Sequence, residues 1–341
     1  MLSPLSFIAD RLPPRLLEYG CLMDLIGDAI AAMRAGEPRS ARGRMVGTWG
    51  IRFRASGGIG VHVVLQGTAW LLPPDGSAPI QLSGGDVALV DRSRPHGLAN
   101  DPHTPLVDAA PGQQAYWTRD ADIPDGVAPM IAMGGTYYLR NVRPHPLISS
   151  LPPVIHMHGH VGADPAVRSV VHLLGSEMAI AGLPGATAAI PALLDLLLIY
   201  VLRAWYRLPS TDCGWAAALR DPGITAALAA MQDRPGEPWT VETLAREAGQ
   251  SRAAFARRFG ELIGQPPLAY LTWWRLTLAA RYLRETPQPL AAIASQVGYT
   301  SEFAFGRAFR REFHVSPGAY RRDQPDNPTL LGSPQEPTLA G

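Results

Sequence analysis

Two histidines in a glycine-rich region are the residues best placed for metal or acid–base chemistry. His62 lies in an apolar run and His96 follows the turn sequence RSRP. A catalytic metal site usually has three protein ligands; Asp86 or His145 could complete such a set, but the spacing does not require it. The alternative is a pair of satisfied histidines in a core or ligand pocket. We favour that alternative and predict no metal site here.

Three further histidines alternate in HPLISSLPPVIHMHGH. On a strand, His156, His158 and His160 would share a face, and we interpret them as surface residues that could bind metal adventitiously. The chain has no GxSxG, no P-loop, no GxGxxG after a strand and no HExxH. The sequence therefore predicts no catalytic residue, no cofactor and no enzyme.

Two arginines occupy equivalent positions of an internal repeat. The first copy reads LAREAGQSRAAFARRFGELIGQPPLAYL and the second IASQVGYTSEFAFGRAFRREFHVSPGAYR. Gly249 matches Gly298 at an offset of 49, and Arg257 matches Arg307 at an offset of 50. A guanidinium can bond guanine O6 and N7, or a phosphate, through two hydrogen bonds, which is compatible with a nucleic-acid partner.

Each copy has the pattern of a helix-turn-helix. A short helix, 241–248 or 290–297, ends at a glycine, and Ser251 or Thr300 offers a hydroxyl as N-cap of the next helix. Phenylalanines then line one face of that second helix, and the opposite face carries arginine. A breaker-free helix over 268–285 joins the copies. If both second helices enter successive major grooves, their separation should be about 34 Å.

This segment resembles the DNA-binding domain of the AraC/XylS family of bacterial transcription regulators. The resemblance rests on LAREAGQSRAAFARRF, YLTWWRLTLAARYL and AAIASQVGYTSEFAFGRAFRREFHVSPGAYRR. It departs from the family at His314, where glycine is usual. The residues that it implies for DNA contact are Arg252, Ala253, Ala256 and Arg257 in the first copy, and Glu302, Phe303, Gly306 and Arg307 in the second.

The implied contacts differ in chemistry. Arg257 and Arg307 suit bases or phosphates, and Glu302 can accept from cytosine N4. Phe303 and Ala253 could touch a thymine methyl group, whereas Ala256 and Gly306 offer little to a base. The alternative for all the charged positions is a solvated helix face.

The N-terminal half has the texture of a β-protein. Apolar runs at Met45–Phe53, Gly60–Leu72 and Val87–Val90 are separated by turn sequences, and another strand is expected over Ala128–Arg140, after a loop over 100–126. This pattern predicts an antiparallel sandwich or barrel. Gly58–Leu98 resembles the cupin domain that is fused to AraC-type DNA-binding domains. A pocket for a small effector is expected among Trp49, His62, Val64, Trp70 and His96.

Helical patterns frame this domain. One helix is expected over 5–35, and residues 164–208 carry two apolar helical faces. The apolar stretch Pro191–Trp205 contains Asp195 and Arg203, so we read it as a buried helix too short to span a membrane. With no secretory signal at the N-terminus, we expect a soluble, cytoplasmic protein without a membrane partner.

Charge and cysteine content narrow the class further. All 30 basic residues are arginine, and the net charge of +1 conceals a segment, 215–323, with 14 arginines against 10 acids, or +4. A basic segment fits a polyanion without establishing one. Cys21 and Cys213 lie 192 residues apart, which argues against a disulfide scaffold or a zinc finger.

The sequence therefore predicts an α+β chain: a cupin-like domain over 1–160, a helical linker or dimerisation region over 164–208, a double helix-turn-helix domain over 215–323, and a disordered tail over 324–341. Its expected function is that of a homodimeric regulator, most consistent with an activator, that binds promoter DNA under the control of a small effector; RNA polymerase is a candidate further partner. One alternative is a metal-dependent cupin enzyme with a DNA-binding appendage, and another is a helical interaction module that does not bind DNA. The effector and the target promoter cannot be read from the sequence.

Overall fold

The computed structural model describes residues 27, 38–109, 123–124, 126, 128–137, 149–159, 164–180, 183–208 and 214–322. The helix expected over 5–35 lies outside this part of the chain, apart from the helical residue 27. So do the expected tail at 324–341, both cysteines, His145 and His160.

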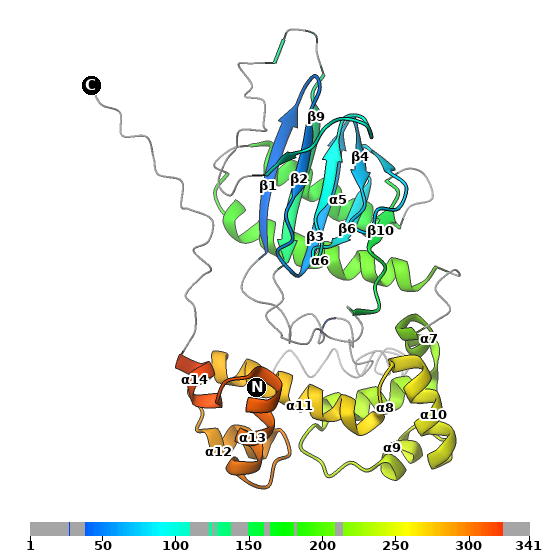
Figure 1. Ribbon diagram of the computed structural model, residues 1–341, viewed down its shortest axis with the longest axis vertical. Coiled ribbons are helices and arrows are strands. Elements are labelled where there is room, and N and C mark those ends of the chain that lie inside the picture. Colours follow the sequence, from blue (N-terminus) through cyan, green and yellow to red (C-terminus); the bar gives the residue numbers. More distant parts are fainter. Residues whose placement is uncertain are drawn as a thin grey trace, which may run out of the picture.

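Two five-stranded sheets face each other in the N-terminal half. The strands are β1 (Arg39–Met45), β2 (Gly50–Phe53), β3 (Ile59–Gln66), β4 (Thr68–Leu72), β5 (Ile80–Ser83), β6 (Val87–Asp91), β7 (His96–Ala99), β8 (Val107–Asp108), β9 (Met130–Tyr137) and β10 (Val154–Met157). One sheet has the order β1-β9-β3-β6-β10 and the other β5-β4-β7-β2-β8. Figure 1 labels strands of both sheets, among them β3 and β4. The predicted α+β class and β-sandwich are confirmed.

The strand boundaries differ from the expectation where glycine bends the chain. The expected strand Met45–Phe53 is two strands, separated at Gly47 with a φ of 71°, and Gly60–Leu72 is divided at Gly67 with a φ of 80°. His96 begins β7, although we expected it to end its motif. The expected loop 100–126 contains the short β8, whose pairing with β2 is parallel.

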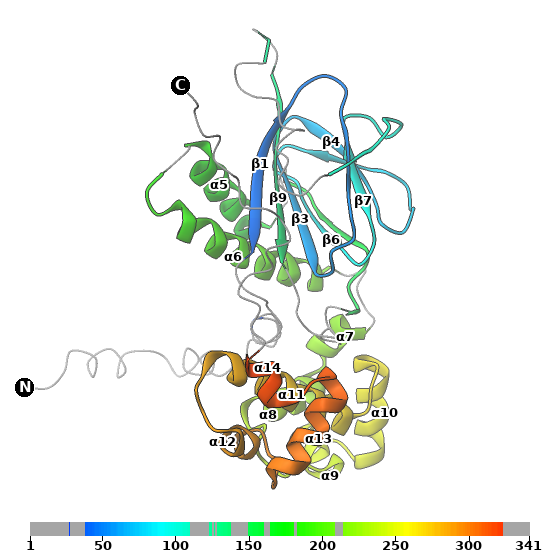
Figure 2. The ribbon, with the colours of Figure 1, turned by 60° about the vertical axis from the view of Figure 1, so that its left-hand side comes forward.

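Strand alternation divides the buried side chains into two layers. In β3, Val61 and Val63 face outward, where they pack against two helices, α5 (Pro165–Ala179) and α6 (Ala186–Tyr206). Val64 faces the interior of the sandwich and packs with Leu71 and Leu98 of the opposite sheet. Figure 2 shows α5 and α6 on the outer side of the first sheet, away from β4 and β7.

Helix α6 is the one helix in the described part of the chain that is long and apolar enough to cross a membrane: it has 21 residues and contains an 18-residue window with a mean hydropathy of 1.8. It begins five residues before Pro191, so our expectation that this segment is too short was wrong. In the structure one face of α6, including Leu194, Leu197 and Val201, is buried in the core that it shares with α5 and the first sheet.

The C-terminal part is helical. Its helices are α7 (Gly214–Arg220), α8 (Pro222–Asp233), α9 (Val241–Glu247), α10 (Arg252–Ile263), α11 (Pro267–Glu285), α12 (Leu290–Gln296), α13 (Glu302–Phe313) and α14 (Pro317–Arg322). The pairs α9–α10 and α12–α13 are the two predicted helix-turn-helix units, and the long α11 connects them (Figure 1).

Hydroxyl N-caps start both second helices. Ser251 Oγ accepts from Ala254 N at 3.4 Å, and Ser301 Oγ accepts from Ala304 N at 3.1 Å. We expected Thr300 to cap the second unit, but α13 begins one residue later and Ser301 has the capping geometry. The glycines of both turns, Gly249 and Gly298, have positive φ as predicted, at 63° and 83°.

Candidate nucleic-acid interface and effector pocket

Buried aromatic faces fix the orientation of both second helices. In α10, Phe255 and Phe259 are fully buried. In α13, Phe305 and Phe309 are fully buried, and the Phe309 ring packs against Phe313 at a centroid distance of 4.4 Å. Since these side chains recur every four residues, the opposite face of each helix must point to solvent.

The structure places most of the predicted contact residues on that solvent face. Arg252, Ala253 and Arg257 of α10 are exposed, and Ala256 is half-buried. On α13 the same positions repeat the pattern: Glu302, Phe303 and Arg307 are exposed, and Gly306 is half-buried. Phe303 is 75% exposed, the highest value among the large apolar side chains of the described residues.

The two equivalent arginines, Arg257 and Arg307, make only weak contacts within the protein. Arg257 Nε lies 4.0 Å from Glu261 Oε1 one turn later, with both side chains exposed. The Arg307 guanidinium lies 5.8 Å from the centroid of the Phe303 ring. Exposed pairs of this kind contribute about 1 kcal/mol or less, so both guanidinium groups can turn toward another partner at little cost.

Arg258 has a different environment from its neighbour Arg257. Its Nε donates to Asp221 Oδ2 at 3.1 Å, and Asp221 is the N-cap of α8. Asp221 also accepts from the backbone of Gly223 and Ile224. Arg258 therefore attaches α10 to α8 and is not part of the free arginine face.

The connector α11 is tied to both units by one side chain. Arg275 donates to the carbonyl oxygens of Pro235 and Glu237, each at 2.6 Å, in the loop before α9. Its guanidinium also lies against the turn of the second unit, because a Cβ added to Gly298 would come within 2.7 Å of it. These contacts support a fixed relation between α10 and α13.

Sequence reasoning overlooked one further exposed arginine. Arg311 follows Arg307 by one helical turn and is exposed in the last turn of α13. Its spacing of four residues from Arg307 places both side chains on the same side of the helix. This spacing is the sequence feature that could have identified Arg311. A contact to the phosphate backbone is the chemistry that suits this position.

Inside the sandwich, the structure brings the two predicted histidines together. His62 Nε2 and His96 Nε2 are 2.8 Å apart, and the side chains of both residues are buried. The Phe53 ring stacks on His96 with a centroid distance of 5.0 Å and an interplanar angle of 15°. His96 Nδ1 is buried without a hydrogen-bond partner in the described part of the chain, so a small ligand could satisfy it.

Arg92 adds a positive charge beside this pair. Its Nη1 donates to Thr136 Oγ1, and its Nη2 donates to the Arg54 carbonyl at 3.2 Å. Burial, reinforced by Arg92, lowers the pKa of His96 to about 3. Burial, then the neighbouring His96 and Arg92, lowers the pKa of His62 well below its usual value. Both rings are thus neutral near pH 7, and one must donate to the other.

The other expected pocket residues lie elsewhere. Val64 is on the inner face of β3 in the apolar part of the core. Trp49 packs against the same core, just before β2, at the end of that strand away from Phe53. Trp70 does not face the interior: Ala69 and Leu71 do, so alternation along β4 turns Trp70 to the outer surface of the sheet. Our placement of Trp70 in the pocket was therefore wrong.

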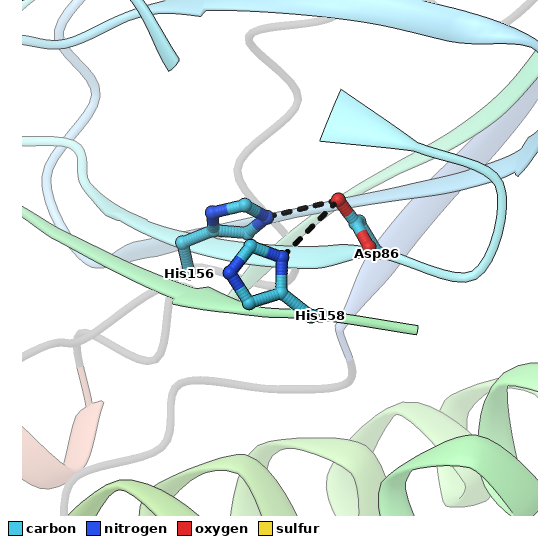
Figure 3. Close-up of side chains that lie close together, drawn as sticks. All are labelled: Asp86, His156 and His158. Carbon is cyan, nitrogen blue, oxygen red and sulfur yellow. Dashed lines mark hydrogen bonds and ion pairs between the residues drawn. The ribbon is translucent and has the colours of Figure 1, made fainter. Parts of the chain in front are cut away.

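A second polar cluster lies at the end of β10. His156 Nε2 is 3.0 Å from Asp86 Oδ2, and His158 Nδ1 is 3.9 Å from the same oxygen. Figure 3 shows that both imidazole rings point toward Asp86. His156 is not the surface residue that we expected, because its side chain is only 16% exposed; that of His158 is 60% exposed. Asp86 belongs with these histidines and not with His62.

Comparisons with known proteins agree with both halves of the chain. A cupin family model matches residues 24–207, and a helix-turn-helix domain model matches residues 244–323. An AraC-like transcription regulator of Streptomyces antibioticus is 35% identical over 88% of this chain and 99% of its own length. The HTH-type transcriptional regulator AlkR of Acinetobacter baylyi is 31% identical over 81% of this chain and 92% of its own.

Among solved structures, the DNA-binding domain of AdpA, crystallised in complex with a target DNA, is 35% identical. The match covers 30% of this chain and 91% of that domain, with a TM-score of 0.29.

Proposed function

Because this chain belongs to the AraC family of transcription regulators, we propose that it binds specific promoter sequences through the exposed faces of α10 and α13. One observation carries the proposal: two helix-turn-helix units present Arg257 and Arg307 at equivalent exposed positions, joined by a helix that holds both units. The DNA-binding domain of this proposal is 215–323.

The proposed contacts follow the chemistry of each side chain. Arg257 and Arg307 bind bases or phosphates. Arg252 adds a contact from the same helix as Arg257, and Arg311 adds a phosphate contact from the same helix as Arg307. Glu302 accepts from cytosine, Phe303 contacts a thymine methyl group, and Ala253 of the first unit contacts another. Ala256 and Gly306 are half-buried and small, so they let the helices approach the bases closely.

The effector site that we propose is the polar end of the sandwich interior, around Phe53, His62 and His96. Two buried neutral imidazoles, with the half-buried Arg92 guanidinium beside an apolar core, suit a small molecule with an apolar body and a polar or anionic group. This assignment keeps His62 and His96 of the expected pocket, leaves Val64 and Trp49 as its apolar surroundings, and omits Trp70.

A short physical connection joins this site to the helices. On β9, Thr136 accepts from Arg92, and the next residue, Tyr137, donates to the Leu194 carbonyl of α6. A ligand that moves Arg92 would therefore displace a strand that holds α6. Ligand control still requires that the effector bind one conformer more tightly than the other.

The remaining parts of the proposal extend our sequence expectations. Helices α5 and α6, within 164–208, form a homodimer interface, since Leu173 of α5 is 49% exposed and α6 keeps half-buried Leu196 and Ile199. The protein acts in the cytoplasm, activates transcription with RNA polymerase as a further partner, and is not an enzyme. Among the described residues, His62 and His96 have no third metal ligand near them, which disfavours the cupin-enzyme alternative.

Genome-wide mapping of bound DNA, followed by anisotropy titrations on the recovered sites, tests the function. We expect specific binding whose affinity falls steeply with salt, because arginine–phosphate contacts release counterions. Absence of salt-dependent binding to any duplex would instead support a helical interaction module. Genes beside the mapped sites would supply candidate effectors, whose binding should be lost in His62→Leu and His96→Leu proteins.

A further inference from the structure

The cluster at the end of β10 has ligand atoms spaced as a metal ion requires. Asp86 Oδ2 lies 3.0 Å from His156 Nε2 and 3.9 Å from His158 Nδ1, and all three ligand atoms lie within 4.8 Å of one another. In a tetrahedral Zn²⁺ site with ligand bonds of about 2.0–2.1 Å, neighbouring ligand atoms are about 3.4 Å apart. Small rotations of two imidazoles would therefore produce this geometry.

The carboxylate of the cluster is held in place by the backbone. Asp86 Oδ1 accepts from Gly159 N at 2.7 Å, and Asp86 Oδ2 accepts from Ser83 N at 3.0 Å. His156 Nε2 lies 3.0 Å from Asp86 Oδ2, so both carboxylate oxygens are fixed by neighbouring groups. Hydrogen bonds of this kind orient metal ligands in known sites.

The chain around the cluster is closely packed. Gly85 has a φ of 92°, and a Cβ added to Gly159 would lie 2.2 Å from the Gly85 carbonyl carbon, so only glycine fits at residue 159. Pairing of β6 with β10 places Ala88 opposite His156, which brings Asp86 beside the residues that follow β10. Two segments 70 residues apart in the sequence thus converge on one point.

From this arrangement we propose that Asp86, His156 and His158 bind one divalent transition-metal ion, Zn²⁺ by the character of the donors. Two imidazole nitrogens and one carboxylate oxygen supply three ligands (Figure 3). Because the His158 side chain is 60% exposed, water can take the fourth position. The ion joins the turn before β6 to the residues that directly follow β10. The site is separate from the DNA-binding helices and does not depend on them.

The test is a titration of untagged, chelator-treated full-length protein with Zn²⁺ alone, in competition with a chromophoric chelator. We expect one Zn²⁺ per chain. Losing an outer-shell partner of a metal typically weakens binding 10–100-fold, so His156→Ala and His158→Ala, which remove ligands, should each weaken it at least about 100-fold. His103→Ala, at an exposed loop residue outside the cluster, is the matched control and should bind as the unmodified chain does.

Two outcomes would overturn the proposal: no stoichiometric Zn²⁺ binding, or unchanged affinity in His158→Ala. Because His158 is exposed, its replacement keeps the test valid if His156→Ala does not fold. Co²⁺ gives an independent readout, since a tetrahedral site shows visible absorption bands. These bands should appear in the His103→Ala protein and be absent in His158→Ala.

Discussion

Gly264 and His314 end helices α10 and α13 in the same left-handed backbone conformation, with φ of 78° and 61°. They occupy equivalent positions of the repeat, at the offset of 50 residues. Each N–H donates to the carbonyl oxygen four residues earlier, Gly260 or Arg310. The fold thus requires this conformation in both units, although His314 is the only non-glycine residue with positive φ in the described part of the chain.

Replacing His314 by glycine should stabilise the second unit by about 1 kcal/mol. A left-handed conformation costs a non-glycine residue roughly 1–2 kcal/mol, part of which glycine returns through its greater freedom in the unfolded chain. The free energy of unfolding can be measured in urea by the loss of helical circular dichroism. Gly264→Ala is the reciprocal control: a Cβ there meets no atom within 4 Å, so its expected loss of about 1 kcal/mol is conformational. A His314→Gly protein no more stable than the parent would contradict this account.

Arg257→Ala and Arg307→Ala should each weaken binding to a mapped promoter site by about 1–3 kcal/mol, the value of a good bidentate base contact. Fluorescence anisotropy at fixed salt measures the loss. Arg258→Ala is the matched control on the same helix, because the exposed Arg258 side chain is held in an ion pair with Asp221. It should keep the affinity for DNA and lose at most about 1 kcal/mol of stability. If the Arg257 and Arg307 variants bind as tightly as the control, recognition lies on another face.

The helical domain could be predicted from the sequence because its signals are local. Phenylalanines at helical spacing define the buried face of α10 and of α13, and glycines mark both turns. The repeat strengthens each signal, since a pattern seen twice constrains its own alignment. The error at Thr300 has a local cause as well: two hydroxyl residues are adjacent, and only the backbone geometry shows that Ser301 accepts the capping bond.

The pocket and the second cluster could not be predicted as well, because both depend on strand register. Trp70 was misplaced since alternation gives two faces without saying which is internal; a shift of one residue exchanges them. Asp86 and His156 meet only through the pairing of β6 with β10. No local sequence pattern links residues that far apart. His62 and His96, by contrast, both lie in strands of the expected barrel, so their assignment to one pocket was possible from the sequence.

Phe303 should contribute to base preference and not to stability. Its ring is 75% exposed, so Phe303→Ala removes little buried surface. If the ring touches a thymine methyl group, replacing that thymine by uracil in the DNA should weaken binding of the unmodified protein and leave the Phe303→Ala protein unaffected. Anisotropy titrations with a set of singly substituted duplexes would reveal the position. Equal responses of the two proteins to every substitution would exclude this contact.

The stability of the strand domain should fall as pH decreases from about 6.5 toward 4. Burial keeps His62 and His96 neutral in the folded chain, with pKa values below the ordinary 6.5, whereas the unfolded chain takes up protons through this range. Because the unfolded state then binds more protons, acid favours unfolding, by up to about 1.4 kcal/mol per pH unit for each histidine. Asp86 acts in the same direction but at lower pH: its pKa is lowered from 3.8, so the unfolded chain again binds more protons and this contribution to stability is lost as the pH falls through 3.8 and below.

Urea unfolding of the full chain between pH 7 and 4.5 therefore isolates the histidines. We expect a His62→Gln, His96→Gln double variant to show a shallower decline with pH than the parent, whatever its stability at pH 7. His103→Gln, at an exposed histidine, is the control and should keep the parent slope. Identical slopes for the double variant and the parent would show that the buried pair does not govern the acid response, and that a different titrating group must be sought.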